Sequence, residues 1–140
     1  MSSSEIQNSE NLDNNFDLIV SYLADQKYIK IIARGNLTVE ANQQSVVTAI
    51  EACRKFNCSL ILLDERNVTV AMNFVDIYDL PQHNEHLGVS NNIRVAILYS
   101  QGLANDKVFR LYEDRAVISD FKHYIFYDEE AAIAWLLKEQ

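Results

Sequence analysis

The run Leu60-Ile61-Leu62-Leu63 constrains the fold more than any other part of the chain. Four consecutive branched apolar side chains, followed directly by Asp64-Glu65-Arg66, are typical of a strand that is buried on both faces of a parallel sheet. In open α/β sheets, ligand-binding groups collect beyond the carboxyl ends of such strands. The sequence therefore predicts an α/β fold, with these three charged residues where such folds place their function.

The segments on either side of this run give the order of the elements. Alternating apolar residues predict an antiparallel hairpin over residues 16–35, with a tight polar turn at 24–27. An amphipathic helix is predicted over residues 38–56, and a loop over 67–71. Strands and helices then alternate to the end of the chain. The predicted order is ββαβαβαβα, a mixed and mostly parallel sheet with an N-terminal antiparallel hairpin.

The length and composition indicate one globular domain preceded by a tail. The chain has 140 residues and a hydrophobic fraction of 49%, enough to bury one sizeable core. Residues 1–15 are rich in Ser, Asn and Glu, so we expect a mobile tail there. The domain is predicted to span residues 16–140.

The charge balance excludes some classes of partner. The formal net charge is −8, which repels phosphate backbones, so nucleic-acid binding is not expected. The apolar runs are too short for a membrane span. We expect a cytoplasmic protein, because the N-terminus lacks the pattern of a signal peptide and the two cysteines, Cys53 and Cys58, make no disulfide framework.

Three local patterns resemble the SpoIIAA-like branch of the STAS superfamily (sulfate transporter and anti-sigma factor antagonist). They are Ile61-Leu-Leu-Asp-Glu-Arg66, Ile93-Arg-Val-Ala-Ile-Leu-Tyr-Ser100 and Ile125-Phe-Tyr-Asp-Glu-Glu-Ala-Ala-Ile-Ala-Trp-Leu136. The resemblance implies a small cytoplasmic module without catalytic machinery that binds a partner protein or a small ligand. Other members of this branch look similar to Sec14-type lipid carriers, which implies an apolar ligand as an alternative.

The resemblance also implies a candidate for phosphorylation. In the anti-sigma antagonists a serine is phosphorylated at the start of the helix after the central strand, in an Asp-Ser-Ser-Gly type of motif. The corresponding segment here, residues 67–71, has neither that serine nor the glycine, and Thr69 is its one hydroxyl residue. Thr69 is therefore the candidate site of a phospho-switched anti-sigma antagonist.

The predicted contact surface is the segment 64–74. Its candidate residues are Asp64, Glu65, Arg66, Thr69, Met72 and Phe74. The three charged residues either bind a polar ligand or form ion pairs at the end of the sheet, and neighbouring side chains in a strand point to opposite faces. The apolar residues after them either pack the first turn of a helix or form the lip of a pocket.

Patterns for catalysis and cofactors are absent from the sequence. His83 and His86 lack the further ligands of a zinc site. There is no glycine-rich phosphate loop and no nucleophile in a recognisable motif. The sequence thus predicts a non-enzymatic protein with no metal and no cofactor. Self-association into a homodimer, through a helical face or a strand edge, stays open.

Overall fold

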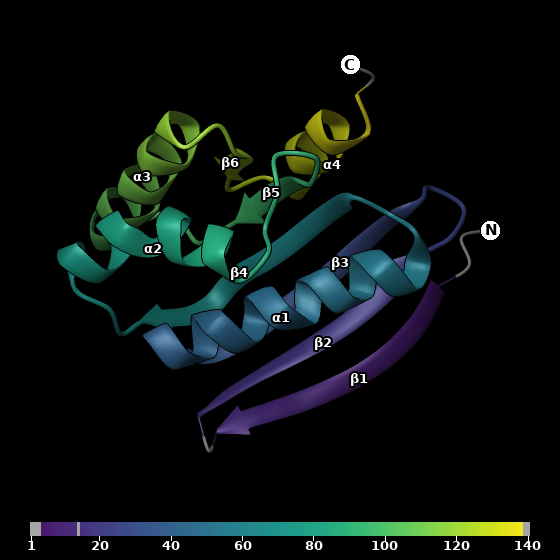
Figure 1. The fold of residues 1–140 in the computed structure, drawn as a ribbon, viewed down its shortest axis with the longest axis horizontal. Coiled ribbons are helices and arrows are strands. Elements are labelled where there is room, and N and C mark those ends of the chain that lie inside the picture. The colour runs from purple at the N-terminus through teal and green to yellow at the C-terminus, as the bar shows by residue number, and fades with distance from the viewer. Residues whose placement is uncertain (1–3, 14, 139–140) are drawn as a thin grey trace.

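The computed structural model describes residues 4–13 and 15–138, which form six strands and four helices (Figure 1). The elements are β1 (Ser4–Asp13), β2 (Phe16–Leu23), β3 (Tyr28–Leu37), α1 (Val39–Phe56), β4 (Leu60–Val70), α2 (Phe74–His86), β5 (Arg94–Leu98), α3 (Leu103–Ile118), β6 (Lys122–Phe126) and α4 (Glu129–Leu137). Residues 1–3 and 14 of the predicted tail, and residues 139–140 of the predicted domain, lie outside the described residues.

The strands form one sheet in the order β1-β2-β3-β4-β5-β6. β2 and β3 pair as an antiparallel hairpin, with Leu23 opposite Tyr28. β3, β4, β5 and β6 are parallel to their neighbours. From residue 16 onward this confirms the predicted order ββαβαβαβα and the mixed, mostly parallel sheet.

The first strand differs from the prediction, because β1 pairs antiparallel with β2 where a mobile tail was expected. The prediction considered only how much apolar surface the side chains of this polar segment can bury. Strand pairing uses the backbone N–H and C=O groups, which every residue except proline supplies, and the outer edge of β2 offers unpaired groups of this kind. The sheet therefore has one strand more than the sequence analysis assigned to it.

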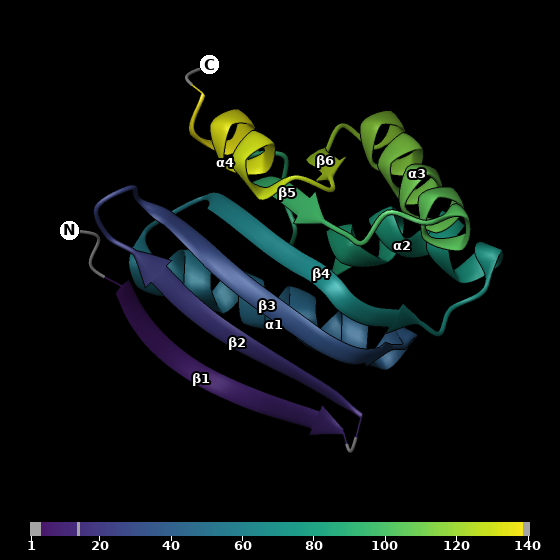
Figure 2. The same cartoon turned by 180° about the vertical axis from the view of Figure 1, so that it is seen from behind.

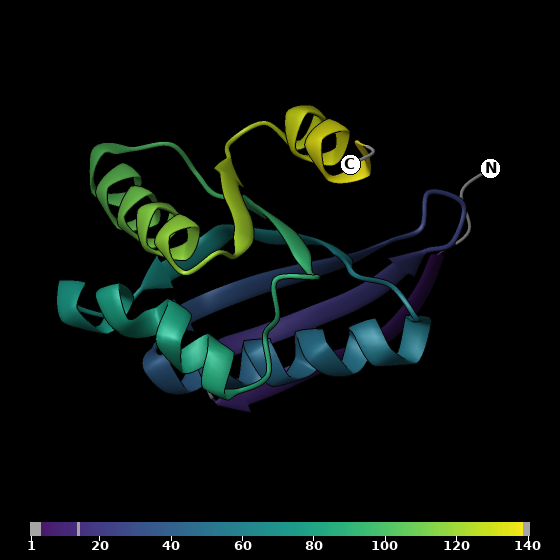
Figure 3. The ribbon, with the colours of Figure 1, turned by 45° about the horizontal axis from the view of Figure 1, so that its top comes forward.

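The helices are divided unequally between the two faces of the sheet. Figure 3 shows α1 and α2 on one side of the sheet and α4 on the other. The view from behind in Figure 2 shows the side on which α4 lies. A large core lies beneath α1, α2 and α3 and includes Ile31, Ile77 and Phe109. A smaller core, with Leu62 and Leu136, lies beneath α4. Successive right-handed crossovers in one direction place α1, α2 and α3 on the same face.

Gly35, near the end of β3, permits a close approach of two backbone segments. The amide of Asn36 donates to the carbonyl of Asn15 at 2.7 Å. Gly35 has a φ of +109°, and a Cβ atom placed there would lie 1.7 Å from the carbonyl oxygen of Asn15. Only glycine fits both the backbone conformation and the space.

Both ends of α4 are capped. Asp128 accepts a hydrogen bond from the first turn, as expected of an acidic N-cap. At the other end the buried guanidinium of Arg94 donates to the carbonyls of Trp135, Leu136 and Lys138 at 2.7, 3.1 and 2.7 Å. Arg94 also lies 4.5 Å from the centre of the Trp135 ring. A cation at this position complements the negative end of the helix dipole.

Candidate functional site

The central strand is longer than the sequence indicated. β4 runs to Val70, so Asp64, Glu65 and Arg66 lie inside the strand, and most of the predicted loop 67–71 is strand. The reason is the long partner strand β3, whose Leu37 pairs with Val70. The alternation of β-branched residues in Val68-Thr69-Val70 suits a pleated strand and is the signal that the loop prediction overlooked.

The three charged residues do not meet at one point. Glu65 faces the side of α1, α2 and α3, where it lines a cavity. Asp64 and Arg66 face the side of α4, where they pair with each other. Between Ile32 and Arg34 the register of β3 and β4 shifts, so that Glu65 and Arg66 lie opposite one residue as in a β-bulge.

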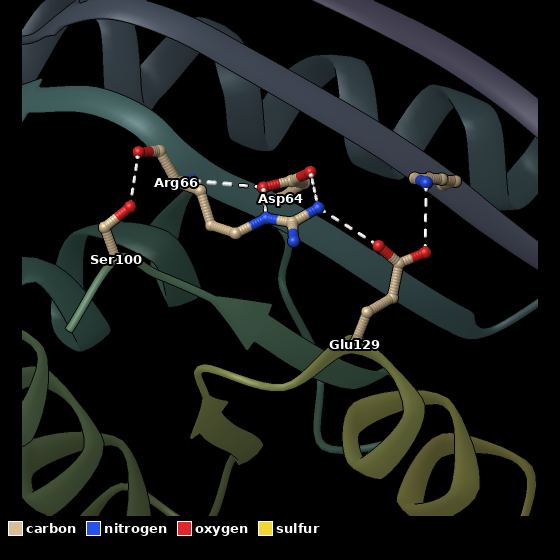
Figure 4. A network of polar contacts seen from close by, with 5 residues as sticks. Asp64, Arg66, Ser100 and Glu129 are labelled. Atoms are coloured by element: carbon tan, nitrogen blue, oxygen red, sulfur yellow. Dashed lines mark hydrogen bonds and ion pairs between the residues drawn. The ribbon is translucent and has the colours of Figure 1, made fainter.

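On the α4 side the charges form a connected network (Figure 4). The Arg66 guanidinium donates to both carboxylate oxygens of Asp64, at 3.0 and 2.8 Å, and to Glu129 of α4 at 3.0 Å. Glu129 also accepts from the Lys30 ammonium at 3.2 Å. The hydroxyl of Ser100 donates to the backbone carbonyl of Arg66 at 2.9 Å.

This network favours the structural interpretation of Asp64 and Arg66. Burial raises the pKa of Asp64, but the hydrogen bonds from Arg66 outweigh it, and the pKa lies below its usual value. The carboxylate and the guanidinium thus satisfy each other, and Glu129 ties α4 to the sheet. The side chains of Arg66 and Glu129 stay 38% and 34% exposed, so part of this network still faces solvent.

Glu65, unlike Asp64, has no cation beside its carboxyl group among the described residues. The residue is only 9% exposed, and burial and the charge of Asp64, not a hydrogen bond, govern its carboxyl. Its oxygens are not among the fully buried side-chain atoms that lack a partner, so they keep some contact with the cavity or with solvent. Burial, and to a lesser extent the charge of Asp64, raise its pKa from 4.5 to about 7. Buried carboxyl groups are ordinarily paired. An unpaired one at the wall of a cavity marks a candidate functional site.

The cavity has a volume of about 100 Å³ and lies between the sheet and α1, α2 and α3. Most of its wall is aliphatic, with Val46 and Ala49 from α1, Ile61 from β4 and Val95 from β5. Some of the lining residues, Met72 among them, are only half-buried. The cavity therefore approaches the surface near the connection between β4 and α2.

A chain of buried polar side chains completes the wall. Asn42 donates to Asn84 at 3.0 Å, and Asn84 donates to the hydroxyl of Tyr112 at 3.3 Å. The Tyr112 oxygen lies 2.7 Å from Nδ1 of His123. Burial lowers the pKa of His123 from 6.5 to about 4, so the imidazole is neutral at physiological pH.

The hydrogen bonds of this chain assign its protons. Because the Tyr112 oxygen accepts from Asn84, its own proton is available for Nδ1 of the neutral His123 ring, which leaves the imidazole proton on Nε2. Nε2 of His123 is buried and has no partner among the described residues. Asn84 and Tyr112 are thus satisfied, whereas Nε2 of His123 is a buried donor without a partner in the described part of the chain. The carboxyl of Glu65 lines the same cavity.

The other three candidate residues are distributed around the end of β4. Met72 lines the cavity, as the pocket-lip interpretation requires. Phe74 begins α2 and is 58% exposed. Thr69 is exposed on β4, in register with Asn36 of β3, and the N-cap of α2 is Asn73. Thr69 therefore does not occupy the helix start that a phosphorylated serine would, and its modification stays a prediction.

Sequence reasoning missed the polar partners of the cavity. Tyr112 and His123 are far apart in sequence from Glu65, and no motif joins them. One signal was available for Glu65 itself, since Ile61, Leu63 and Glu65 occupy alternate positions of one strand and must share a face. A carboxyl group in line with two core residues is a buried carboxyl group.

Two absences among the described residues bear on other functions. No group of three or more His, Cys, Asp or Glu side chains among them is placed to hold a metal ion. Within the same residues, no helix has the length and apolar character needed to cross a membrane.

Comparison with solved structures identifies the fold. The chain is similar to the crystal structure of an uncharacterized protein of the DUF3478 family with a SpoIIAA-like fold, from Shewanella loihica PV-4. The TM-score is 0.51 at 19% sequence identity, and the match covers 97% of this chain and 95% of the other. The protein has a SpoIIAA-like fold. No protein-family model and no curated protein matches the chain.

Proposed function

We propose that this protein is a non-enzymatic module that binds a small, mostly apolar ligand in the cavity beneath α1, α2 and α3. The observation that supports it is a cavity of about 100 Å³ with the unpaired carboxyl of Glu65 in its wall. Protein interiors are ordinarily packed as densely as organic crystals, and unpaired buried polar groups are costly. A ligand that fills the space and meets the carboxyl offsets both costs.

The size of the cavity favours a small ligand over a lipid. An engineered apolar cavity of about 150 Å³ holds one benzene molecule, and the cavity here, at about 100 Å³, is of the same order. An acyl chain fits only if the helices that cover the sheet move apart. We therefore place the small ligand ahead of the Sec14-like lipid carrier that the resemblance suggested.

Xenon and benzene are suitable probes for this proposal, because they report apolar space without needing a polar partner. We expect both to shift the amide and methyl NMR signals of lining residues such as Val46, Ile61 and Val95. A saturating probe also raises stability, by about 2.7 kcal/mol at a ligand concentration 100 times the Kd. Fluorescent fatty acid, in a parallel titration, tests the lipid alternative.

A filled cavity serves as the control. Ala49→Leu places extra methyl groups in the cavity wall and should abolish the shifts, whereas Ala134→Leu makes the same change on the exposed face of α4 and should leave them intact. Shifts that are absent in the unaltered protein, or that survive Ala49→Leu, contradict ligand binding in this cavity. Saturable binding of the fatty acid would restore the lipid carrier.

An exposed apolar surface supports a second candidate function, binding of a protein partner. Phe74, Val75 and Tyr78 in the first turns of α2 are 58%, 68% and 50% exposed. The simplest partner to test is a second copy of the chain, by sedimentation over a range of concentrations. Phe74→Glu should weaken self-association, whereas Val47→Glu on the exposed side of α1 should not. A monomer at all concentrations would remove the homodimer.

The phospho-switch at Thr69 is the third candidate, and it follows from the resemblance alone. Comparing the intact mass of the protein from its own cells before and after phosphatase treatment tests it. A phosphate lost on treatment and absent from Thr69→Val supports the switch. A mass that phosphatase leaves unchanged opposes it.

A further inference from the structure

The polar groups around the cavity differ in what they can still bind. Asn42, Asn84 and Tyr112 are joined in one hydrogen-bonded chain. The carboxyl of Glu65 lines the same cavity as the unpartnered Nε2–H of His123, but its raised pKa has no hydrogen bond among its causes. When ionised, the carboxyl is an acceptor at both oxygens. The ligand group that Glu65 lacks is therefore a hydrogen-bond donor.

The charges around Glu65 select the kind of donor. Asp64, its neighbour in the chain, lies on the other face of the sheet and adds negative potential at Glu65. The groups that face Glu65 from the packed helices and from β6 are Asn42 and Ser45 of α1, Asn84 of α2, Tyr112 of α3 and the neutral His123. None of these described groups carries a positive charge.

The net charge of the protein also favours a positively charged donor. With a formal net charge of −8, the chain attracts cations and repels anions. A carboxylate ligand would place a second negative charge beside Glu65 and Asp64, which is unfavourable in a poorly hydrated interior. A positive donor instead forms a charge-assisted hydrogen bond with Glu65.

The remaining wall defines the rest of the ligand. Val46, Ala49, Ile61 and Val95 offer only apolar contact, and the volume of about 100 Å³ limits the ligand to a few heavy atoms. A branched aliphatic body fits these four residues better than a polar one, whereas Nε2 of His123, a buried donor in the same wall, meets no acceptor on such a ligand.

We propose that the ligand is a small aliphatic amine, whose ammonium group binds the carboxylate of Glu65 and whose apolar body fills the space between α1 and the sheet. This inference rests on the proposed function and deepens it. Binding requires the ionised form of Glu65. When the free protein carries a proton there, that proton passes to solvent as the ammonium enters, and the net charge of the site is conserved.

Three compounds of matched shape test the choice of donor: isobutylamine, isobutanol and isobutyrate. We expect NMR titrations at pH 8 to give a Kd for the amine at least 10-fold lower than for the alcohol, with no binding of the acid. From pH 6 to pH 8 the affinity for the amine should rise about tenfold, because Glu65 ionises over this range while the amine stays charged. The affinity for the alcohol should change little.

Two variants, each replacing one glutamate by glutamine, test whether the preference for the amine depends on Glu65. Glu65→Gln keeps the shape of the side chain and should abolish both the preference for the amine and its pH dependence. Glu51→Gln removes a charge from the exposed side of α1 and should preserve both. A preference that survives Glu65→Gln, or an amine that binds no better than the alcohol, overturns the inference.

The two proposals fail in distinguishable ways. If xenon and benzene shift the lining residues but the amine shows no preference, the cavity binds small apolar molecules and the amine assignment is wrong. If neither xenon, benzene nor the amine shifts the NMR signals of the lining residues, the cavity is not a binding site and both proposals are wrong.

Discussion

Glu65→Gln should make the protein more stable at pH 8 while changing its stability little at pH 4. Burial raises the pKa of Glu65 from 4.5 to about 7, so the folded state holds this proton more tightly than the unfolded state does. The stabilising effect of that proton is fully present below the unfolded pKa and is lost as the pH rises through the folded pKa. Glutamine has no proton to lose.

The magnitude follows from the two pKa values. A pKa difference of one corresponds to about 1.36 kcal/mol, so raising the Glu65 pKa from 4.5 to about 7 makes folding about 3 kcal/mol less favourable at high pH. Between pH 5 and pH 8 we expect the difference in unfolding free energy between Glu65→Gln and the unaltered protein to grow by about 2 to 3 kcal/mol.

Urea unfolding followed by the fluorescence of Trp135, the one tryptophan of the chain, measures this difference. Both proteins are unfolded at intervals from pH 5 to pH 8, and subtraction removes the contribution of every other titrating group. Glu51→Gln, on the exposed side of α1, should give a flat difference. If the difference in unfolding free energy for Glu65→Gln is also independent of pH, or if Glu65→Gln is less stable than the unaltered protein at pH 8, the burial of an unpaired carboxyl is refuted.

Three further results are expected. Gly35→Ala should lower the unfolding free energy in urea by about 3 kcal/mol or more, since the new methyl meets the carbonyl of Asn15. Gly102→Ala, with no atom within 4 Å of the new Cβ, should cost far less. Equal losses in the two variants would contradict the assigned contact. Arg94→Met should cost about 2 to 4 kcal/mol, because three carbonyls at the end of α4 lose their donor; an unchanged urea midpoint would show that this cap is not needed. The His123 ring should stay neutral at pH 5 in a nitrogen-detected NMR titration, because burial lowers its pKa to about 4, and a midpoint near 6.5 would show that it is hydrated.

Elements that local patterns decide are predictable from the sequence. The apolar run at 60–63 is a strand inside a parallel sheet, as predicted, and the helix predicted over residues 38–56 from its periodicity is α1. These features depend on neighbours in the chain, so their information is present in short segments.

The failures concern features that depend on a partner strand or on distant residues. Residues 4–13 have little apolar content and were not assigned as a strand, because their pairing depends on the free edge of β2. β4 was ended too early, since its length is set by β3. The cavity was out of reach for the same reason: Tyr112 and His123 join Glu65 only when α3 and β6 are in place.

The adjacent positions of Asp64 and Glu65 in one strand have a consequence for signalling through the molecule. The two carboxyl groups lie on opposite faces of the sheet, one facing α4 and one facing the cavity. The charge of Asp64 nevertheless raises the pKa of Glu65. An event that loosens Arg66 from Asp64 on the α4 side leaves a bare negative charge behind the cavity wall. The added negative potential would raise the pKa of Glu65 further, so the two faces of the sheet are coupled through charge.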